Sequence, residues 1–406
     1  MSPPGRPTGA GVALTATLAI QIFVSLVATA AAVLAPEVAQ TFSIAPKWIG
    51  VFVSLIYVGA MFASLASGGV IQRYGAIRVS QACVILCVAG SVLVVLAPDR
   101  AVVLLVIAAL VIGIGYGPIT PASSHVLVRT ATPSNFALTF SIKQTGVPAG
   151  AALAGAILPG LALALGWRNA FVAMAIAGLV VVAGAQAVRA TLDADRIGGS
   201  GWRFSPAGVF APLALVRRSR ALTELTLIGL CYAATQVCLM SFLVVYLTEA
   251  LGWTLVAAGL ALTVTTLGGV AGRIVWGWAA DRLLKPRRVL GMLGIVAFGC
   301  SLALAFAHPA WPVAGLLAVA AVFGGTAIGW NGVQLAEVAR HAPAGAAGAV
   351  TGAAGFITFS GVVAGPPIFA LLAGLTGSYR VGFVAFGVMS GLAGLMLLLR
   401  REPRSA

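Results

Sequence analysis

Two basic residues lie inside apolar segments that are long enough to cross a membrane. Lys143 is about eight residues into the segment 135–165, and Arg273 is eight residues before Asp281 in the segment 254–280. At 1.5 Å per residue, each cation is about 12 Å from one end of its segment, the N-terminal end for Lys143 and the C-terminal end for Arg273. A cation at the bilayer centre costs roughly 2.5–3.5 kcal/mol on insertion scales, so residues of this kind indicate a function.

The nine acidic residues all fall in expected loops or near the ends of segments. The charge pattern therefore predicts that the substrate supplies the negative charge, with a carboxylate as the preferred candidate. Arginine binds a carboxylate through two parallel hydrogen bonds, while lysine supplies a point charge. Two other readings of Arg273 stay open: it could snorkel toward the headgroups, or pair with Asp281 or with helix-end carbonyls.

Other polar and aromatic residues in the apolar segments are candidates for completing a substrate site. An amide in such a segment usually hydrogen-bonds something specific, and helix packing explains each of these residues equally well. The further predicted substrate-binding residues are Gln21, Tyr57, Gln144 and Asn331, and the wider set includes Tyr116, Gln236, Trp330 and Gln334.

The composition predicts an all-α membrane protein. Sixty per cent of the 406 residues are hydrophobic and 8% are charged, whereas a soluble domain carries roughly 25% charged residues. Apolar stretches of about 20 residues match the thickness of a bilayer. The sequence predicts twelve transmembrane helices, near 11–35, 49–71, 78–97, 101–127, 135–165, 168–188, 222–247, 254–280, 288–307, 311–338, 345–374 and 379–399.

A repeat divides these helices into two copies. Residues 68–75 and 277–284 are 209 apart, and each stretch has a small residue followed five positions later by an arginine. An internal repeat of this length is how many carriers are built. We therefore expect two pseudo-symmetric six-helix bundles, at 1–188 and 222–406, joined by a cytoplasmic linker at 189–221.

The basic residues predict the orientation in the membrane. Of 24 lysines and arginines, 18 fall in loops on one side and four on the other. The positive-inside rule then places both termini in the cytoplasm of a multi-pass inner-membrane protein. The net charge of +15 is spread over loops, so contact with anionic membrane lipid explains it and nucleic acid is not an expected partner.

The sequence contains no motif that indicates catalysis or cofactor binding. It has no phosphate-binding loop and no zinc-type cluster of His and Cys residues. We therefore expect a non-enzyme without cofactor or metal, a monomer that binds a small-molecule substrate. Ion or solute gradients would drive it, with a coupling proton or a counter-solute as the possible partner.

The paired Gly-x3-[Asp/Gln]-Arg loops resemble the signature of the major facilitator superfamily. The resemblance implies two bundles that alternate in access around a central site, with the loop residues acting in gating. The gating residues that it implies are Gly68, Arg73, Gly75, Gly277, Asp281 and Arg282. Gln72 stands where the first copy usually has an acid, so we expect it only to hydrogen-bond, and Leu284 stands where the first copy has Gly75.

Arg273-x3-Gly277 is also similar to monocarboxylate and oxalate/formate carriers, which place an arginine in the eighth helix. In this superfamily helices five and eight face each other, which implies that Lys143 and Arg273 approach one central cavity. The acid that precedes the arginine by four in monocarboxylate carriers is Gly269 here. This departure weakens the similarity to proton-coupled lactate transport.

The leading hypothesis is a secondary active transporter that moves a small organic anion by alternating access. A second hypothesis is efflux of drugs or metabolites. The first helix lacks the membrane acid that is usual in such carriers, and this counts against the second hypothesis. A third is a membrane sensor that keeps the carrier fold without transporting.

Overall fold

The computed structural model describes residues 9–43, 48–196 and 206–400. Every regular element in these ranges is a helix. Elements of the first half are α1 (Ala10–Val33), α2 (Ala35–Thr41), α3 (Trp48–Tyr74), α4 (Ala76–Leu96), α5 (Val102–Tyr116), α6 (Ile119–Thr130), the 3-10 turn η1 (Pro133–Asn135), α7 (Phe136–Gln144), α8 (Gly146–Leu165) and α9 (Trp167–Leu192). Those that follow are α10 (Pro206–Arg218), α11 (Arg220–Glu249), α12 (Leu255–Arg282), α13 (Pro286–Ala305), α14 (Val313–Ala327), α15 (Asn331–Arg340), α16 (Ala347–Thr376) and α17 (Tyr379–Leu399).

Twelve helical segments of the described chain are long and apolar enough to span a membrane, which confirms the predicted fold class. Three of these segments consist of two helices each: α5 with α6, α7 with α8, and α14 with α15. The hydropathy pattern predicts each of the three as one helix. It predicts no helix at α2 or α10, and α10 lies in the predicted linker, of which residues 197–205 are outside the described ranges.

The breaks have local causes. Gly117 and Pro118 separate α5 from α6, because proline lacks the N–H that would continue the helical ladder. A Cβ at Gly117 would overlap the carbonyl of Ala60, so glycine also allows α5 to approach α3. Residues 328–330 separate α14 from α15, and Gly329 likewise lies against the backbone of Gly272 on α12.

Contacts divide the chain into two compact units. Unit 1 comprises Met1–Thr132, Lys143–Leu215 and Ala342–Phe356; unit 2 comprises Pro133–Ile142, Val216–His341 and Ile357–Ala406. Each unit thus contains one short segment from the other half of the sequence. The predicted division at the linker follows the sequence halves and stays a prediction.

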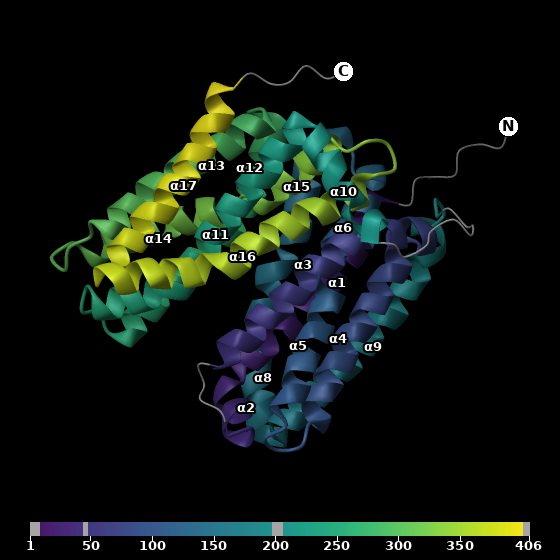
Figure 1. Cartoon of the computed structure of the whole chain (residues 1–406), viewed down its shortest axis with the longest axis horizontal. Coiled ribbons are helices and arrows are strands. Elements are labelled where there is room, and N and C mark those ends of the chain that lie inside the picture. The colour runs from purple at the N-terminus through teal and green to yellow at the C-terminus, as the bar shows by residue number, and fades with distance from the viewer. Residues whose placement is uncertain (1–8, 44–47, 197–205, 401–406) are drawn as a thin grey trace. The chain divides into compact units, whose positions relative to one another are not determined.

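Each unit contains the same pairs of helices. In unit 1, α4 packs beside α9 and α5, while α13 packs beside α17 and α14 in unit 2 (Figure 1). In unit 1, α8 lies so close to α1 that a Cβ at Gly150 would overlap the Ile22 carbonyl. In unit 2, Gly361 allows α16 the same approach to the Leu230 carbonyl of α11. Both glycines belong to pairs of small residues four apart, Gly146 with Gly150 and Gly361 with Gly365, a spacing that lets helix backbones approach closely.

Candidate functional site

Lys143 is buried in unit 1 at the end of α7, with 1% of its surface exposed. Its Nζ donates to Gln21 Oε1 at 2.7 Å, Gln144 Oε1 at 3.0 Å and Thr120 Oγ1 at 3.4 Å. An ammonium group has three donors, and a buried cation needs them bonded. The predicted residues Gln21, Lys143 and Gln144 therefore form one cluster.

Three elements position this cluster. Gln21 comes from α1, where its Nε2 also donates to Ser25 Oγ at 3.1 Å. Lys143 and Gln144 stand before the break at Thr145, and Thr120 stands in the first turn of α6. The first N–H groups of a helix have no partner within that helix and give its N-terminus a partial positive charge. The Lys143 ammonium and the N-terminus of α6 thus add to one positive region.

Arg273 is equally buried in unit 2, with 1% exposed, on α12. Its Nε donates to the carbonyl of Ile328 at 3.1 Å. Ile328 is the C-cap of α14, so the break before α15 leaves this carbonyl available to a side chain. This bond matches the reading in which Arg273 pairs with a helix-end carbonyl.

Asn331 lies at the same break. Its Nδ2 donates to the Ile328 carbonyl at 3.3 Å and to Gln236 Oε1 at 3.1 Å. Gln236 Oε1 also accepts from Trp330 Nε1 at 3.1 Å. Arg273 and Asn331 therefore share one acceptor, and both lie beside the N-terminus of α15.

The remaining predicted substrate-binding residue, Tyr57, lies in unit 1. Its ring packs edge-on against Tyr116, with 6.1 Å between the ring centroids. In unit 2, Gln334 of the wider set donates to the Leu225 carbonyl at 3.1 Å, which fits the helix-packing reading.

Sequence reasoning missed two members of these clusters, Thr120 and the Ile328 carbonyl. The Gly117-Pro118 pair was the available signal for Thr120, because it marks the start of a new helix next to it. A backbone carbonyl has no sequence signal of its own, and the break at 328–330 contains no proline.

The gating residues of the second copy meet the start of α7 within unit 2. Asp281 accepts from the backbone N–H of Ala137 at 3.0 Å and of Leu138 at 2.8 Å. Arg282 donates to Asn135 Oδ1 at 3.0 Å. A Cβ at Gly277 would overlap Ser141. The carboxylate therefore caps the N-terminus of α7, where a negative charge is favourable.

The first copy meets the start of α16 within unit 1. Gln72 Nε2 donates to the Gly345 carbonyl at 3.1 Å. Gly68 lies against Ala349, where a Cβ would not fit. The Arg73 guanidinium lies over the ring of Tyr74, 5.3 Å from its centroid.

Gly75 ends the first loop with a φ of 94°, a conformation that favours glycine. Asp193, at the end of α9, lies directly against it. The Asp193 carboxylate accepts from the backbone N–H of Ile77 at 2.8 Å and of Arg78 at 2.9 Å, and so caps α4. Nearby, Asp195 bonds His125 at 2.7 Å. Both aspartates lie in the range 189–221 that the sequence predicts as a linker.

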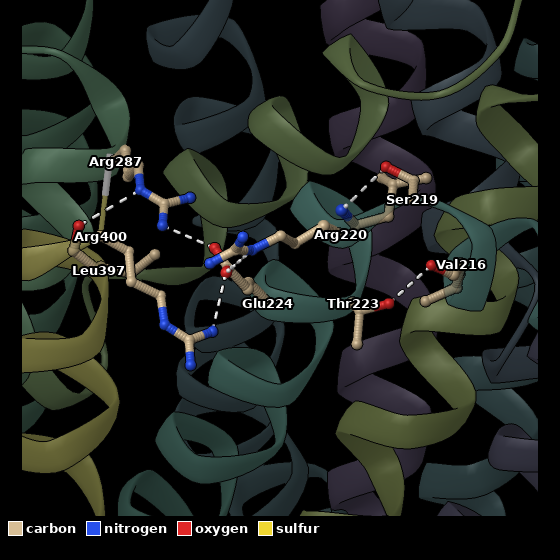
Figure 2. A network of polar contacts seen from close by, with 9 residues as sticks. Val216, Ser219, Arg220, Thr223, Glu224, Arg287, Leu397 and Arg400 are labelled. Carbon is tan, nitrogen blue, oxygen red and sulfur yellow. Dashed lines mark hydrogen bonds and ion pairs between the residues drawn. The ribbon is translucent and has the colours of Figure 1, made fainter. Parts of the chain in front are cut away.

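In unit 2, arginine side chains surround one buried carboxylate (Figure 2). Glu224 on α11 is buried, and Figure 2 shows three guanidinium groups converging on it. Arg287 Nη2 lies 2.6 Å from Glu224 Oε2, while Arg220 and Arg400 each lie 3.0 Å from Oε1. Arg287 also donates to the Leu397 carbonyl at 3.3 Å. This cluster ties α11 to α13 and to the end of α17.

A sequence profile of the Major Facilitator Superfamily matches residues 17–366. With twelve apolar helices in its described residues, a repeated loop and a match over most of its length, the chain belongs to this superfamily. It is a multi-pass membrane transporter and not an enzyme.

Two plant proteins are similar to a part of this chain. Probable anion transporter 5 of Arabidopsis thaliana is 33% identical over 131 residues, which is 32% of this chain and 30% of that protein. Probable anion transporter 6 of Oryza sativa subsp. japonica is 29% identical over 130 residues, with the same coverage. The match therefore spans about a third of each relative.

Solved structures share the fold over nearly the whole chain. The human organic anion transporter MFSD10 has a TM-score of 0.76 at 15% identity, covering 97% of this chain and 100% of that one. The E. coli fucose:proton symporter has a TM-score of 0.74 at 16% identity, with the same coverage. At these identities the likeness concerns the fold alone.

Proposed function

We propose that this protein is a secondary active transporter of a small organic anion, with a carboxylate as the preferred substrate, and that it works by alternating access. The observation that carries the proposal is the burial of one cation in each unit, Lys143 and Arg273, each 99% inaccessible. A buried cation is retained when it has a function, and substrate binding is such a function in a transporter.

The helix breaks support an anion rather than a neutral substrate. Thr120, which bonds Lys143, stands in the first turn of α6, and Asn331, which shares an acceptor with Arg273, begins α15. In discontinuous membrane helices, such N-termini point at anionic groups of the substrate. A cation and a helix N-terminus in each unit thus favour negative charge twice over.

Binding requires the cations to exchange partners. The acceptors of Lys143 include neutral side-chain oxygens of Gln21, Gln144 and Thr120, and those of Arg273 include the Ile328 carbonyl. A carboxylate makes a shorter and stronger hydrogen bond with either cation than a neutral oxygen does. We propose that the substrate replaces part of these bonds, with Gln21, Gln144, Tyr57 and Asn331 as further ligands.

The two anion transporter relatives agree with this proposal, although they match only part of the chain. We also propose that both termini and the linker are cytoplasmic in the inner membrane, since 18 loop cations lie on that side. In this orientation Asp281 and Gln72 lie at the cytoplasmic ends of their helices, and their contacts would break and re-form during each transport cycle.

The test is counterflow in proteoliposomes that contain the full chain. Vesicles are preloaded with one of lactate, succinate, inorganic phosphate or fucose, and uptake of the same labelled compound is measured. We expect counterflow of at least one carboxylate, and its reduction in Lys143→Gln and Arg273→Gln proteins that insert correctly.

Three outcomes would contradict parts of the proposal. Counterflow of fucose alone would replace the anion with a neutral sugar. If both variants carry out carboxylate counterflow at the wild-type rate, Lys143 and Arg273 do not bind the substrate. Expulsion of hydrophobic dyes without counterflow of any of the four compounds would favour the efflux alternative.

A further inference from the structure

A groove with a volume of about 770 Å³ lies on unit 1, away from the Lys143 cluster. It is lined by residues of α3, α4 and α9, together with Ile114 of α5 and Pro118. In Figure 1, α4 and α9 run side by side in this unit. The volume is within the range of about 300–1,000 Å³ that is typical of small-molecule sites.

One end of the groove is basic. Arg78 near the start of α4 and Arg189 near the end of α9 both line it, with Tyr74 of α3 beside them. Arg78 is exposed and Arg189 is half-buried. Among the described residues, neither guanidinium forms an ion pair. The nearby Asp193 carboxylate instead accepts from the backbone N–H groups at the start of α4.

The rest of the groove is mostly apolar; its polar members are Ser67, Gln81 and Gln186, and the two amides hydrogen-bond each other at 3.1 Å. From Arg78 to Leu86 on α4 it extends over eight residues, which is about 12 Å along the helix. Ala63, Ala66 and Ile85 line this part, and Ile85 is 49% exposed. The small alanine side chains leave the space that the groove occupies. A ligand that fits has a negatively charged end and an apolar body parallel to the helices.

The corresponding region of unit 2 is arranged differently. Arg287, near the start of α13, is buried and bonded to Glu224, whereas Arg78 points outward. On the adjoining face, Leu398 of α17 packs directly against Gly291 of α13. The exposed basic end therefore belongs to unit 1 and is not a general consequence of the repeat.

We propose that this groove binds one anionic phospholipid, with its phosphate between Arg78 and Arg189 and an acyl chain along α3 and α4. Basic pockets between membrane helices on the cytoplasmic side bind the headgroups of anionic lipids. Tyr74, with 47% of its surface exposed, lies at the level of the two arginines and suits the interface between headgroups and acyl chains. The proposal does not depend on which substrate the protein transports.

The experiment is native mass spectrometry of the purified full chain in detergent, titrated with dioleoyl phosphatidylglycerol or dioleoyl phosphatidylcholine. Each arginine near an anionic group contributes about a fivefold change in affinity, so Arg78→Gln/Arg189→Gln should weaken phosphatidylglycerol binding about thirtyfold. The matched control is Arg217→Gln/Arg288→Gln, which removes two exposed arginines of unit 2 and should leave the affinity unchanged.

A second pair of variants tests the acyl-chain part with both arginines intact. Ala82 on α4 lines the groove, so Ala82→Trp should fill it and displace lipid. Ala89 on the same helix is also exposed, and Ala89→Trp serves as the control. Thermal unfolding in detergent checks that each protein is folded. If the double arginine variant is not folded, the comparison of Ala82→Trp with Ala89→Trp decides the question.

Tighter binding of phosphatidylglycerol than of phosphatidylcholine, lost in the arginine variant and in Ala82→Trp, is the expected result. Equal binding of the two lipids, or unchanged affinity in either of those variants, would overturn the proposal. Full displacement of the lipid by soluble glycerol 3-phosphate would also overturn it, because the groove would then recognise a free anion without its chain.

Discussion

Asp281 in unit 2 and Gln72 in unit 1 occupy the same position of the repeated loop, yet they bond to opposite backbone groups. Asp281 accepts two N–H groups at the start of α7, whereas Gln72 donates one hydrogen bond to the Gly345 carbonyl before α16. Hydrogen bonds to a charged group contribute about 1.5–3 kcal/mol, against about 0.5–1.5 kcal/mol for a neutral pair. The loop has thus kept its place in both units while the strength of its contact differs.

The ends of the two loops differ as well. Gly75 has a φ of 94° and lies against the aspartate that caps α4. At the matching position, Leu284 has an ordinary negative φ and its N–H bonds the Ala279 carbonyl at 2.9 Å. The first loop therefore depends on glycine and on a cap from α9, and the second does not.

The largest effect is expected from Gly75→Ala. The new Cβ would be strained at this φ and would displace Asp193, so we expect a loss of about 2–4 kcal/mol in the stability of unit 1. Thermal unfolding in detergent measures it. Leu284→Ala is the matched control and should lower the unfolding temperature far less; equal losses in the two variants would refute the comparison.

Asp281→Asn should have the next largest effect. Loss of the carboxylate weakens the cap on α7 by about 1.5–3 kcal/mol, which changes the ratio of the conformations with and without this contact about ten- to hundredfold. We expect turnover in proteoliposomes to fall more than substrate affinity. Unchanged turnover, together with an unchanged distribution of conformations by spin-label distance measurement, would show that Asp281 has no part in gating.

Gln72→Ala should change the same distribution less, because it removes one neutral hydrogen bond of about 0.5–1.5 kcal/mol. The same spin-label measurement, made beside the Asp281 variant, gives the ratio of the two effects. A larger shift for Gln72→Ala than for Asp281→Asn would reverse the order that the contacts indicate.

The smallest effect is expected from Arg282→Gln. Its bond to Asn135 lies at an exposed site, where a polar contact contributes at most about 1 kcal/mol. Turnover should stay within about fivefold of the wild type, which corresponds to about 1 kcal/mol. A loss comparable to that of Asp281→Asn would mean that the arginine acts in the contact itself.

The sequence predicted the features that depend on local spacing. Twelve apolar segments follow from hydropathy, and small residues four apart, as at Gly150 and Gly361, leave room for another helix on one helix face. The motif placed Asp281 in a helical contact but did not identify its partners. Those partners are the backbone N–H groups of Ala137 and Leu138.

Features that depend on tertiary placement could not be predicted. Asp193 caps a helix that begins 117 residues earlier at Ala76, and no pattern near either residue indicates this. One acceptor of Arg273 is the Ile328 carbonyl, which becomes available because α14 ends at Ala327. The sequence did bring Gln21 and Lys143 into one candidate set, through the rarity of polar groups in membrane helices.

The central claim is that Lys143 and Arg273 each contribute to binding the negative charge of the substrate. The most direct test is a double-mutant cycle on the Kd of the carboxylate found by counterflow, measured by calorimetry on wild type, Lys143→Gln, Arg273→Gln and the double variant. We predict a loss of about 1.5–3 kcal/mol for each single variant. The double variant tests whether both cations act on one ligand, because a loss smaller than the sum of the single losses indicates coupling. Wild-type affinity in both single variants, with the proteins folded and correctly inserted, would contradict the claim.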